Sequence, residues 1–335
     1  MKKLKHSVYG WLYLLLMLTF PLPTSAASEP SISPSDTDLT DACFNPLKLE
    51  HTRLKDHTLF FYDDFYYIAS IHLPRAEDQF KDRHFVYART RDFCTWEDLG
   101  IILEPGPEGA PDEGGIWAPY VIREGDTFFM FYTGFNRNVA QSIMLATSTN
   151  PADPESWVRR GLVFQPHHED VVYDGSKPWS DGRDPMVLRY NDRYFLYYTG
   201  RDQHGGIVGV AIAEDLMGTW RDLGPVLRLP EPDGMPESPF VISHDGYFYI
   251  YYNATGSGQR WQWAPSPFGP WQSPVYEPFG WAYDFYFDGT RWLASYLNGY
   301  GEEIQVRPVR WQTHTNPVTP MIHYRSYLPL LRNVE

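Results

Sequence analysis

The chain has 335 residues, a formal net charge of −14 and no cluster of Lys and Arg of the kind that binds phosphate groups. We therefore expect no nucleic-acid partner. Its length suits one large β domain or two small ones, and the 17% of aromatic residues suits an extensive aromatic core.

The N-terminal segment, residues 1–27, has the three parts of a secretory signal peptide. Three lysines within the first five residues supply positive charge, residues 8–20 are apolar, and small residues end the segment at Ala26 and Ala27. We expect cleavage after one of these alanines, so that the protein is secreted or periplasmic and has no membrane segment after cleavage. An uncleaved membrane anchor is the alternative, and the apolar run is short for it.

Residues 28–46 are rich in Ser, Pro, Thr and Asp, and we interpret them as a linker. They contain Cys43, and the other cysteine of the chain is Cys94. In an oxidising compartment these two residues can form a disulfide. Two unpaired thiols also fit the sequence.

From residue 47 onward the chain repeats a strand, a tight polar turn and a second strand. The clearest copy runs from Asp184 to Tyr198, with a turn at Asn191-Asp192. The second strands of the five copies begin 44–66 residues apart, at Tyr66, Phe128, Tyr194, Phe248 and Trp292. A strand-and-turn repeat of this length is typical of a β-propeller, so we predict an all-β, five-bladed β-propeller over residues 47–335.

The first strands of the copies begin with three acids. The residues at these heads are Asp56, Ala118, Asp184, Glu237 and Trp281. Because the innermost strands of a propeller converge on one end of its channel, we expect the three carboxylates to meet there. Glycosidic-bond hydrolysis needs two carboxyl groups in opposite protonation states, and like charges in one pocket separate their pKa values. The pattern therefore predicts a catalytic site made of Asp56, Asp184 and Glu237.

Aromatic residues beside the strand heads are candidates for a sugar-binding platform. They are Trp117, Tyr120, Trp281 and, on the long loop before Asp181, Trp179. Packing within the inner strands is the alternative for Trp117 and Trp281. The cysteines have neither the spacing nor the partners of a metal site, and we predict no metal and no cofactor.

Four motifs carry a family resemblance. They are Asp56-His57-Thr58, Trp117-Ala118-Pro119, Arg183-Asp184-Pro185 and Glu237-Ser238-Pro239. In order and spacing they resemble those of the five-bladed propeller glycosidases of glycoside hydrolase family 43 and its relatives, over about residues 47–311.

The resemblance implies a role for each matching residue. Asp56 corresponds to the general base that activates water, and Glu237 to the general acid. Asp184 corresponds to a third carboxylate that orients the acid and adjusts its pKa. Arg183 is the neighbour of that carboxylate, and we expect it to bind substrate; a structural ion pair is its alternative role.

The chain departs from the family pattern in two places. His57 stands where the family usually has Pro, and residues 280–284 lack the His that holds a central metal ion or water in many members. We therefore do not predict a bound calcium ion.

These observations together predict a secreted, inverting hydrolase acting on a carbohydrate substrate, either arabinofuranosides or xylosides of plant-type glycans. A retaining, fructan- or sucrose-cleaving glycosidase is one alternative, in which Asp56 is a nucleophile. Such enzymes share the Arg-Asp-Pro element but show Asn-Asp-Pro-Asn and Glu-Cys where this chain has Lys55-Asp56-His57 and Glu237-Ser238. A non-catalytic carbohydrate-binding propeller is the other alternative. The sequence leaves the linkage, the mode of attack and the oligomeric state open.

Overall fold

The computed structural model describes residues 43–50, 52–74, 84–166, 181–230, 234–299, 301–312, 317 and 319–322. The predicted signal peptide and most of the predicted linker lie outside these residues. The described residues are almost entirely β, with one short 3-10 helix at Pro154–Ser156. None of their helices is long and apolar enough to cross a membrane.

Strands of the described residues form five antiparallel sheets, each built from four consecutive strands. The first two sheets contain β1 (Thr52–Tyr62), β2 (Phe65–Pro74), β3 (Phe85–Thr90), β4 (Glu97–Leu103), β5 (Gly115–Glu124), β6 (Thr127–Phe135), β7 (Ser142–Ser148) and β8 (Val158–Phe164). The other three contain β9 (Gly182–Tyr190), β10 (Arg193–Asp202), β11 (Gly205–Ala213), β12 (Arg221–Pro230), β13 (Pro236–His244), β14 (Tyr247–Ala254), β15 (Gly258–Ala264), β16 (Val275–Tyr276), β17 (Trp281–Phe287), β18 (Trp292–Asn298), β19 (Glu303–Gln312) and β20 (Thr319–Ile322).

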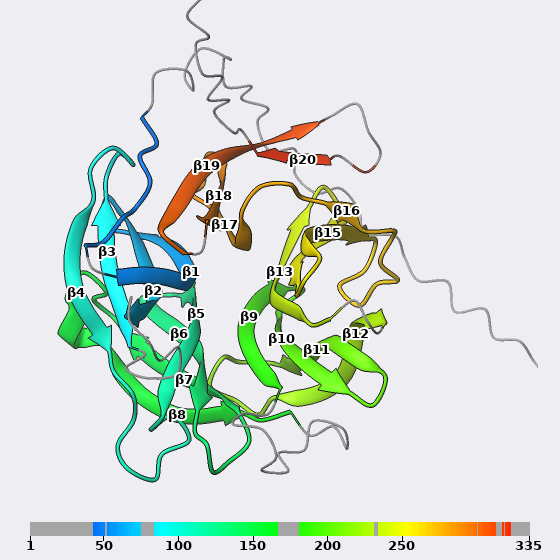
Figure 1. Cartoon of the computed structure of the whole chain (residues 1–335), viewed down its shortest axis with the longest axis horizontal. Coiled ribbons are helices and arrows are strands. Elements are labelled where there is room, and N and C mark those ends of the chain that lie inside the picture. Colours follow the sequence, from blue (N-terminus) through cyan, green and yellow to red (C-terminus); the bar gives the residue numbers. More distant parts are fainter. Residues whose placement is uncertain are drawn as a thin grey trace, which may run out of the picture. The chain divides into compact units, whose positions relative to one another are not determined.

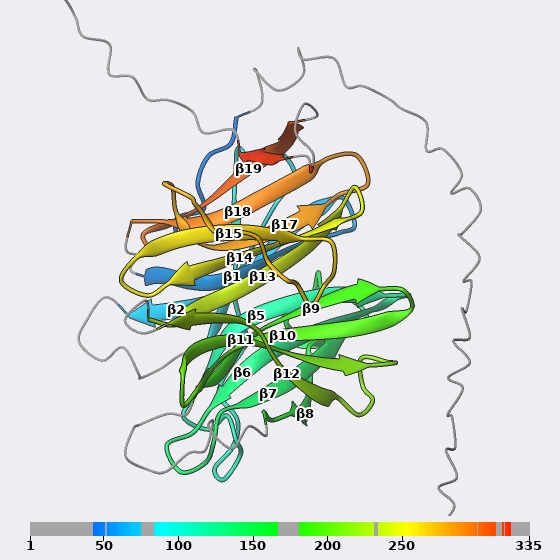
Figure 2. The ribbon, with the colours of Figure 1, turned by 90° about the vertical axis from the view of Figure 1, so that its right-hand side faces the viewer.

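The first strands of the five sheets contact one another in a closed cycle, β1–β5–β9–β13–β17 and back to β1. Figure 1 shows the sheets arranged around these strands, with β4, β8 and β12 at the periphery. Figure 2 shows the sheet that begins with β13 beside the sheet that begins with β9. The predicted all-β, five-bladed β-propeller is therefore confirmed, and each sheet is one blade.

Packing between blades explains why the second strands of the blades are nearly continuous apolar runs in the sequence. Strand β6 is buried at almost every position, because neighbouring blades cover both of its faces. Phe60 of the first blade, for example, packs on Phe128 of the second with ring centroids 5.6 Å apart. Aromatic side chains of this kind fill the space between the blades.

The first and fifth blades close the ring without sharing a strand. The first blade consists of β1 to β4 only, and the fifth consists of β17 to β20 only. His57 Nε2 lies 2.8 Å from Ser295 Oγ, and the Leu59 amide donates to Asp284 Oδ2 at 2.9 Å. Leu47 adds an antiparallel bridge to Ile304. A disulfide joins Cys43 to Cys94, which answers the question that the sequence left open.

A β-bulge interrupts every inner strand at the same level. The residues in the left-handed region there are Asp56 (φ 23°), Ala118 (φ 45°), Asp184 (φ 57°), Ser238 (φ 49°) and Ala282 (φ 51°). This corrects the alignment of strand heads, because Ser238 and Ala282 stand level with the two aspartates. Glu237 and Trp281 come one residue earlier, level with Lys55, Trp117 and Arg183.

Candidate active site

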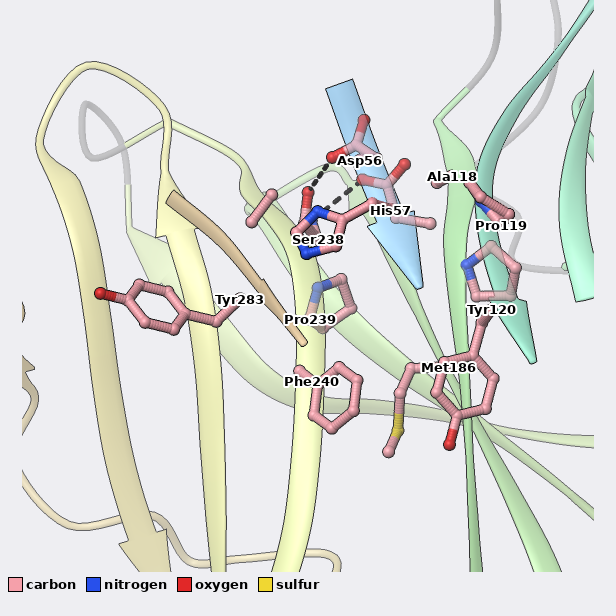
Figure 3. Close-up of a pocket in the computed structure, with 13 residues that line it drawn as sticks. Asp56, His57, Ala118, Pro119, Tyr120, Met186, Ser238, Pro239, Phe240 and Tyr283 are labelled. Carbon is pink, nitrogen blue, oxygen red and sulfur yellow. Dashed lines mark hydrogen bonds between the residues drawn. The ribbon is translucent and has the colours of Figure 1, made fainter. Parts of the chain in front are cut away.

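The bulges turn carboxylates from distant parts of the chain toward one place at the end of the channel. Ser238 on β13 links two of them, because its hydroxyl donates to Asp56 Oδ1 at 2.7 Å and its amide donates to Asp184 Oδ2 at 3.0 Å. Figure 3 shows Asp56 and Ser238 joined in this way. Glu237 directly precedes Ser238, so the structure brings together all three predicted acids.

Asp184 is the most enclosed of the three carboxylates. Its Oδ2 also accepts a hydrogen bond from Thr199 Oγ1 at 3.0 Å, and its own amide donates to Thr133 Oγ1 at 2.9 Å. Burial raises the pKa of Asp184 to about 6; Arg183 opposes this rise, and the negative charge of Asp56 adds to it. Asp184 therefore takes up a proton at mildly acidic pH.

Glu237 is held in an ion pair. The Arg183 guanidinium donates to Glu237 Oε1 at 2.8 Å and to Asp181 Oδ1 at 2.7 Å, and Asp181 in turn lies 3.2 Å from the Arg201 guanidinium. Burial favours the neutral acid, but Arg183 and then Lys55 outweigh it, so the pKa of Glu237 lies below its usual value. The implied roles require Glu237, the general acid, to hold a proton more tightly than Asp184. The pKa shifts of the two residues give the opposite order.

Asp56 and Asp184 line a small cavity. Its volume is about 30 Å³, enough for water, and its walls come from all five inner strands. His57 lines it, and burial lowers the pKa of His57 to about 3, so the imidazole is neutral. Among the described residues, no group of three or more His, Cys, Asp and Glu is placed to hold a metal ion.

Trp179 lies outside the described residues, and the other three aromatic candidates lie in different surroundings. Trp117 is 7% exposed and stacks on Phe135 with centroids 4.8 Å apart, so its ring packs between strands and offers little surface to a sugar. Tyr120 lies in the cavity wall, edge-on to Phe240. Trp281 is partly exposed at the level of Glu237, and its Nε1 donates to the Gly299 carbonyl at 2.9 Å.

Two residues of the site were missed in the sequence. Ser238 stood in the Glu-Ser-Pro motif, but only the register of β13 shows that it occupies the bulge position. Asp181 accepts a hydrogen bond from Arg183, as Glu237 does, and lies two residues before that arginine. The run Asp181-Gly182-Arg183-Asp184 was the available signal.

Residues 56–241 match the family described as glycosyl hydrolases family 32 N-terminal domain. This match covers more than half of the chain and contains Asp56, Asp184 and Glu237. A probable arabinan endo-1,5-alpha-L-arabinosidase B of Aspergillus fumigatus is 24% identical over an alignment of 256 residues, which covers 69% of this chain and 65% of that protein.

Solved structures share the fold. Fructan 1-exohydrolase IIa from Cichorium intybus superimposes with a TM-score of 0.68 at 16% identity, over 84% of this chain and 61% of that one. A GH43_1 enzyme from Xanthomonas citri gives 0.61 at 20% identity, over 83% of this chain and 93% of that one. Both branches of propeller glycosidases considered from the sequence are therefore represented. The resemblance to propeller glycosidases is confirmed, and the chain is an O-glycosyl hydrolase that belongs to the family of the glycosyl hydrolases family 32 N-terminal domain.

Proposed function

We propose that the protein hydrolyses arabinofuranosides or xylosides in plant-type oligo- or polysaccharides. The observation that carries this proposal is the meeting of Asp56, Asp184 and Glu237 at the end of the channel, linked through Ser238 and Arg183. The similarity to a probable arabinan endo-1,5-alpha-L-arabinosidase supports a furanoside in particular.

Each carboxylate receives a role from its surroundings. Asp56, a hydrogen-bond acceptor from Ser238, acts as the general base on water. Glu237, whose side chain is 30% exposed, protonates the leaving oxygen. Asp184 is buried, and its charge state adjusts the electrostatic potential at Asp56 and Glu237.

The ion pair between Arg183 and Glu237 has to weaken before Glu237 can donate a proton. A substrate hydroxyl that accepts a hydrogen bond from Arg183 weakens this pair, and the pKa of Glu237 then rises in the complex. Binding of the correct sugar thereby prepares the acid. In this proposal Arg183 binds the substrate by donating a hydrogen bond to one of its hydroxyl groups.

Cleavage of fructans or sucrose is the second candidate function. The family-32 match and the likeness to a fructan 1-exohydrolase favour it. In that reaction Asp56 attacks the sugar carbon directly and the configuration at that carbon is retained. The Lys55-Asp56-His57 and Glu237-Ser238 sequences distinguish this chain from the motifs of that branch.

Export is the last part of the proposal. The N-terminal segment has the pattern of a signal peptide, and the Cys43–Cys94 disulfide suits an oxidising compartment. N-terminal sequencing of the exported protein should begin at Ala27 or Ser28. Recovery of the uncleaved chain in the membrane fraction would contradict this.

The test is a substrate panel: arabinofuranoside, xyloside and galactoside aryl glycosides, arabinan, arabinoxylan, levan and sucrose. We expect turnover of an arabinofuranoside or xyloside. Proton NMR during the first turnovers then gives the anomer released, and inversion is expected. Turnover confined to levan or sucrose with retention would establish the second candidate, and sugar binding without turnover would overturn both.

A further inference from the structure

Ser238 occupies in the fourth blade the bulge position that Asp56 and Asp184 occupy in the first and third blades. Its backbone is in the left-handed region, with φ of 49°, which is uncommon for a residue other than glycine. This conformation aims the amide and the hydroxyl of one residue at two different carboxylates. The bulge of every blade has this conformation, so the evidence for a role of Ser238 lies in the two hydrogen bonds that it makes.

The two hydrogen bonds of Ser238 differ in what they depend on. The amide donates to Asp184 Oδ2 at 3.0 Å and stays in place whatever the side chain is. The hydroxyl donates to Asp56 Oδ1 at 2.7 Å and depends on the serine. Among the described residues, no other donor reaches Asp56, so its Oδ2 is left for water or sugar.

We propose that Ser238 is a positioning residue for Asp56, whose hydroxyl holds one oxygen of the Asp56 carboxylate and turns the second oxygen toward the reacting centre. A donor to a carboxylate favours the charged form and fixes its rotamer. Asp56 needs a fixed orientation, whether it activates water or attacks the sugar. This role rests on the proposed function only in its consequence for turnover; the effect on Asp56 itself does not need a substrate.

Other charged and titratable groups lie on the inner strands around the site, so a pH effect has to be traced to the right one. They are Lys55 and His57 on β1, Tyr120 on β5, Arg183 and Asp184 on β9, Glu237 on β13 and Asp284 on β17. None of them is hydrogen-bonded to the Ser238 hydroxyl, whose acceptor is Asp56. Removal of that hydroxyl therefore acts first on Asp56.

The chain itself shows that alanine fits the bulge position. Ala118 and Ala282 hold it in the second and fifth blades with φ of 45° and 51°. Ser238→Ala should therefore keep the bulge and the amide bond to Asp184 while it removes the hydroxyl. Ser238→Cys keeps a weaker donor and is the conservative variant.

The first readout is the pH profile of kcat/KM for the parent, Ser238→Ala and Ser238→Cys. We expect the acidic limb of Ser238→Ala to move to higher pH by about 1 unit, because a hydrogen bond to the charged form is lost. Ser238→Cys should fall between the other two, and the basic limb should not move. Ser148→Ala is the matched control, since it removes a buried hydroxyl that bonds to Ser156 Oγ and touches no carboxylate of the site.

The second readout is the Asp56 carboxyl carbon, followed by NMR in the full chain with labelled aspartate and assigned with Asp56→Asn. Its titration midpoint should move to higher pH in Ser238→Ala and stay in place in Ser148→Ala. Midpoints and acidic limbs that coincide with those of the parent would overturn the proposal. If the parent turns over no substrate, the proposed function fails, while the NMR titration still decides the role of Ser238; should Ser238→Ala not fold, Ser238→Gly relieves the left-handed strain and replaces it.

Discussion

At the scale of single residues, the guanidinium of Arg183 decides where a proton rests. It bonds to Glu237 and Asp181 and lies 3.8 Å from Asp184 Oδ2, and its side chain is only 9% exposed. A cation buried among three carboxylates keeps the pKa of Glu237 low and opposes the rise at Asp184. Before substrate binds, therefore, the catalytic proton is not stored on the proposed acid.

The first prediction concerns the basic limb of the kcat/KM profile, which reports the free enzyme. Glu237 must be protonated to donate, and its lowered pKa makes kcat/KM fall as the pH rises through the acidic range. Arg183→Gln should raise the pKa of Glu237 and move this limb to higher pH, while kcat/KM itself drops at least about tenfold because a charge-assisted contact to substrate is lost. Steady-state kinetics from pH 3 to pH 8 measure both effects.

Arg201→Gln is the control for this prediction. Arg201 pairs with Asp181, one step further along the same chain of ion pairs, and shows no ion pair with Glu237. Its basic limb should stay close to that of the parent. A basic limb that Arg183→Gln leaves in place would show that Arg183 does not set the protonation of the acid.

At the scale of elements, the sequence predicted the five repeated hairpins and missed the bulge in each inner strand. Aromatic runs and turn residues mark five hairpins because the second strands of the blades, such as β6 and β10, are buried on both faces between neighbouring blades. The acids were identified because strand heads of a propeller converge. The extra residue of each bulge leaves no trace in the hydrophobic pattern, so Glu237 was aligned with Asp184 although Ser238 holds that position.

Exposure was the other property that the sequence could not supply. Trp117 and Trp281 both directly precede a bulge. The ring of Phe135 covers Trp117, whereas Trp281 is partly exposed. The difference arises because Phe135, the last residue of β6, stacks on Trp117.

The second prediction belongs to β17, which joins the fifth blade to the first through Asp284. Burial raises the pKa of Asp284 to about 8, against the hydrogen bonds from the Leu59 amide and the Thr58 hydroxyl. The folded state thus binds a proton that the unfolded chain has lost, so this residue makes the free energy of unfolding decrease as the pH rises from about 4 to about 8. Asp284→Asn should flatten this decrease, as measured by thermal unfolding at pH 5 and pH 8.

Asp288 on the same blade provides a control of opposite sign. Its carboxylate accepts hydrogen bonds from Tyr66 and Thr290, and its pKa is lowered because these contacts and the Arg291 amide outweigh burial. Its contribution is present above its unfolded pKa and is lost toward acidic pH. Asp288→Asn should therefore destabilise the protein more at pH 8 than at acidic pH. Equal slopes for Asp284→Asn and the parent would refute the assignment of a protonated Asp284.

At the scale of the whole propeller, ring closure depends on the N-terminal strap, residues 43–49. Its amides and carbonyls bond to both end blades, since the Asn45 amide donates to the Phe93 carbonyl at 2.8 Å and Leu47 pairs with Ile304. The Cys43–Cys94 disulfide ties the start of this strap to the first blade. The sequence could not decide this pairing, because the two cysteines are 51 residues apart and become neighbours only when the strap packs on the first blade.

The third prediction follows from this strap. The disulfide closes a loop with a sequence separation of 51 residues. In the chain-entropy model, its loss costs about 4 kcal/mol at most. Cys43→Ser with Cys94→Ser should lower Tm by several degrees, and a reducing agent should lower the parent to the same Tm without a further effect on the double variant. A Tm that neither treatment changes would show that the strap does not hold the ring closed.

The central claim is that the carboxylates gathered by the inner strands carry out glycoside hydrolysis, and Glu237→Gln tests it most directly. We would measure kcat/KM of this variant and the parent on an unactivated arabino-oligosaccharide and on an aryl arabinofuranoside with a good leaving group. The account predicts a loss of about a hundredfold or more on the oligosaccharide and a smaller loss on the aryl substrate, which needs less protonation. Equal activity of parent and variant on the oligosaccharide would contradict it and remove Glu237 from the reaction.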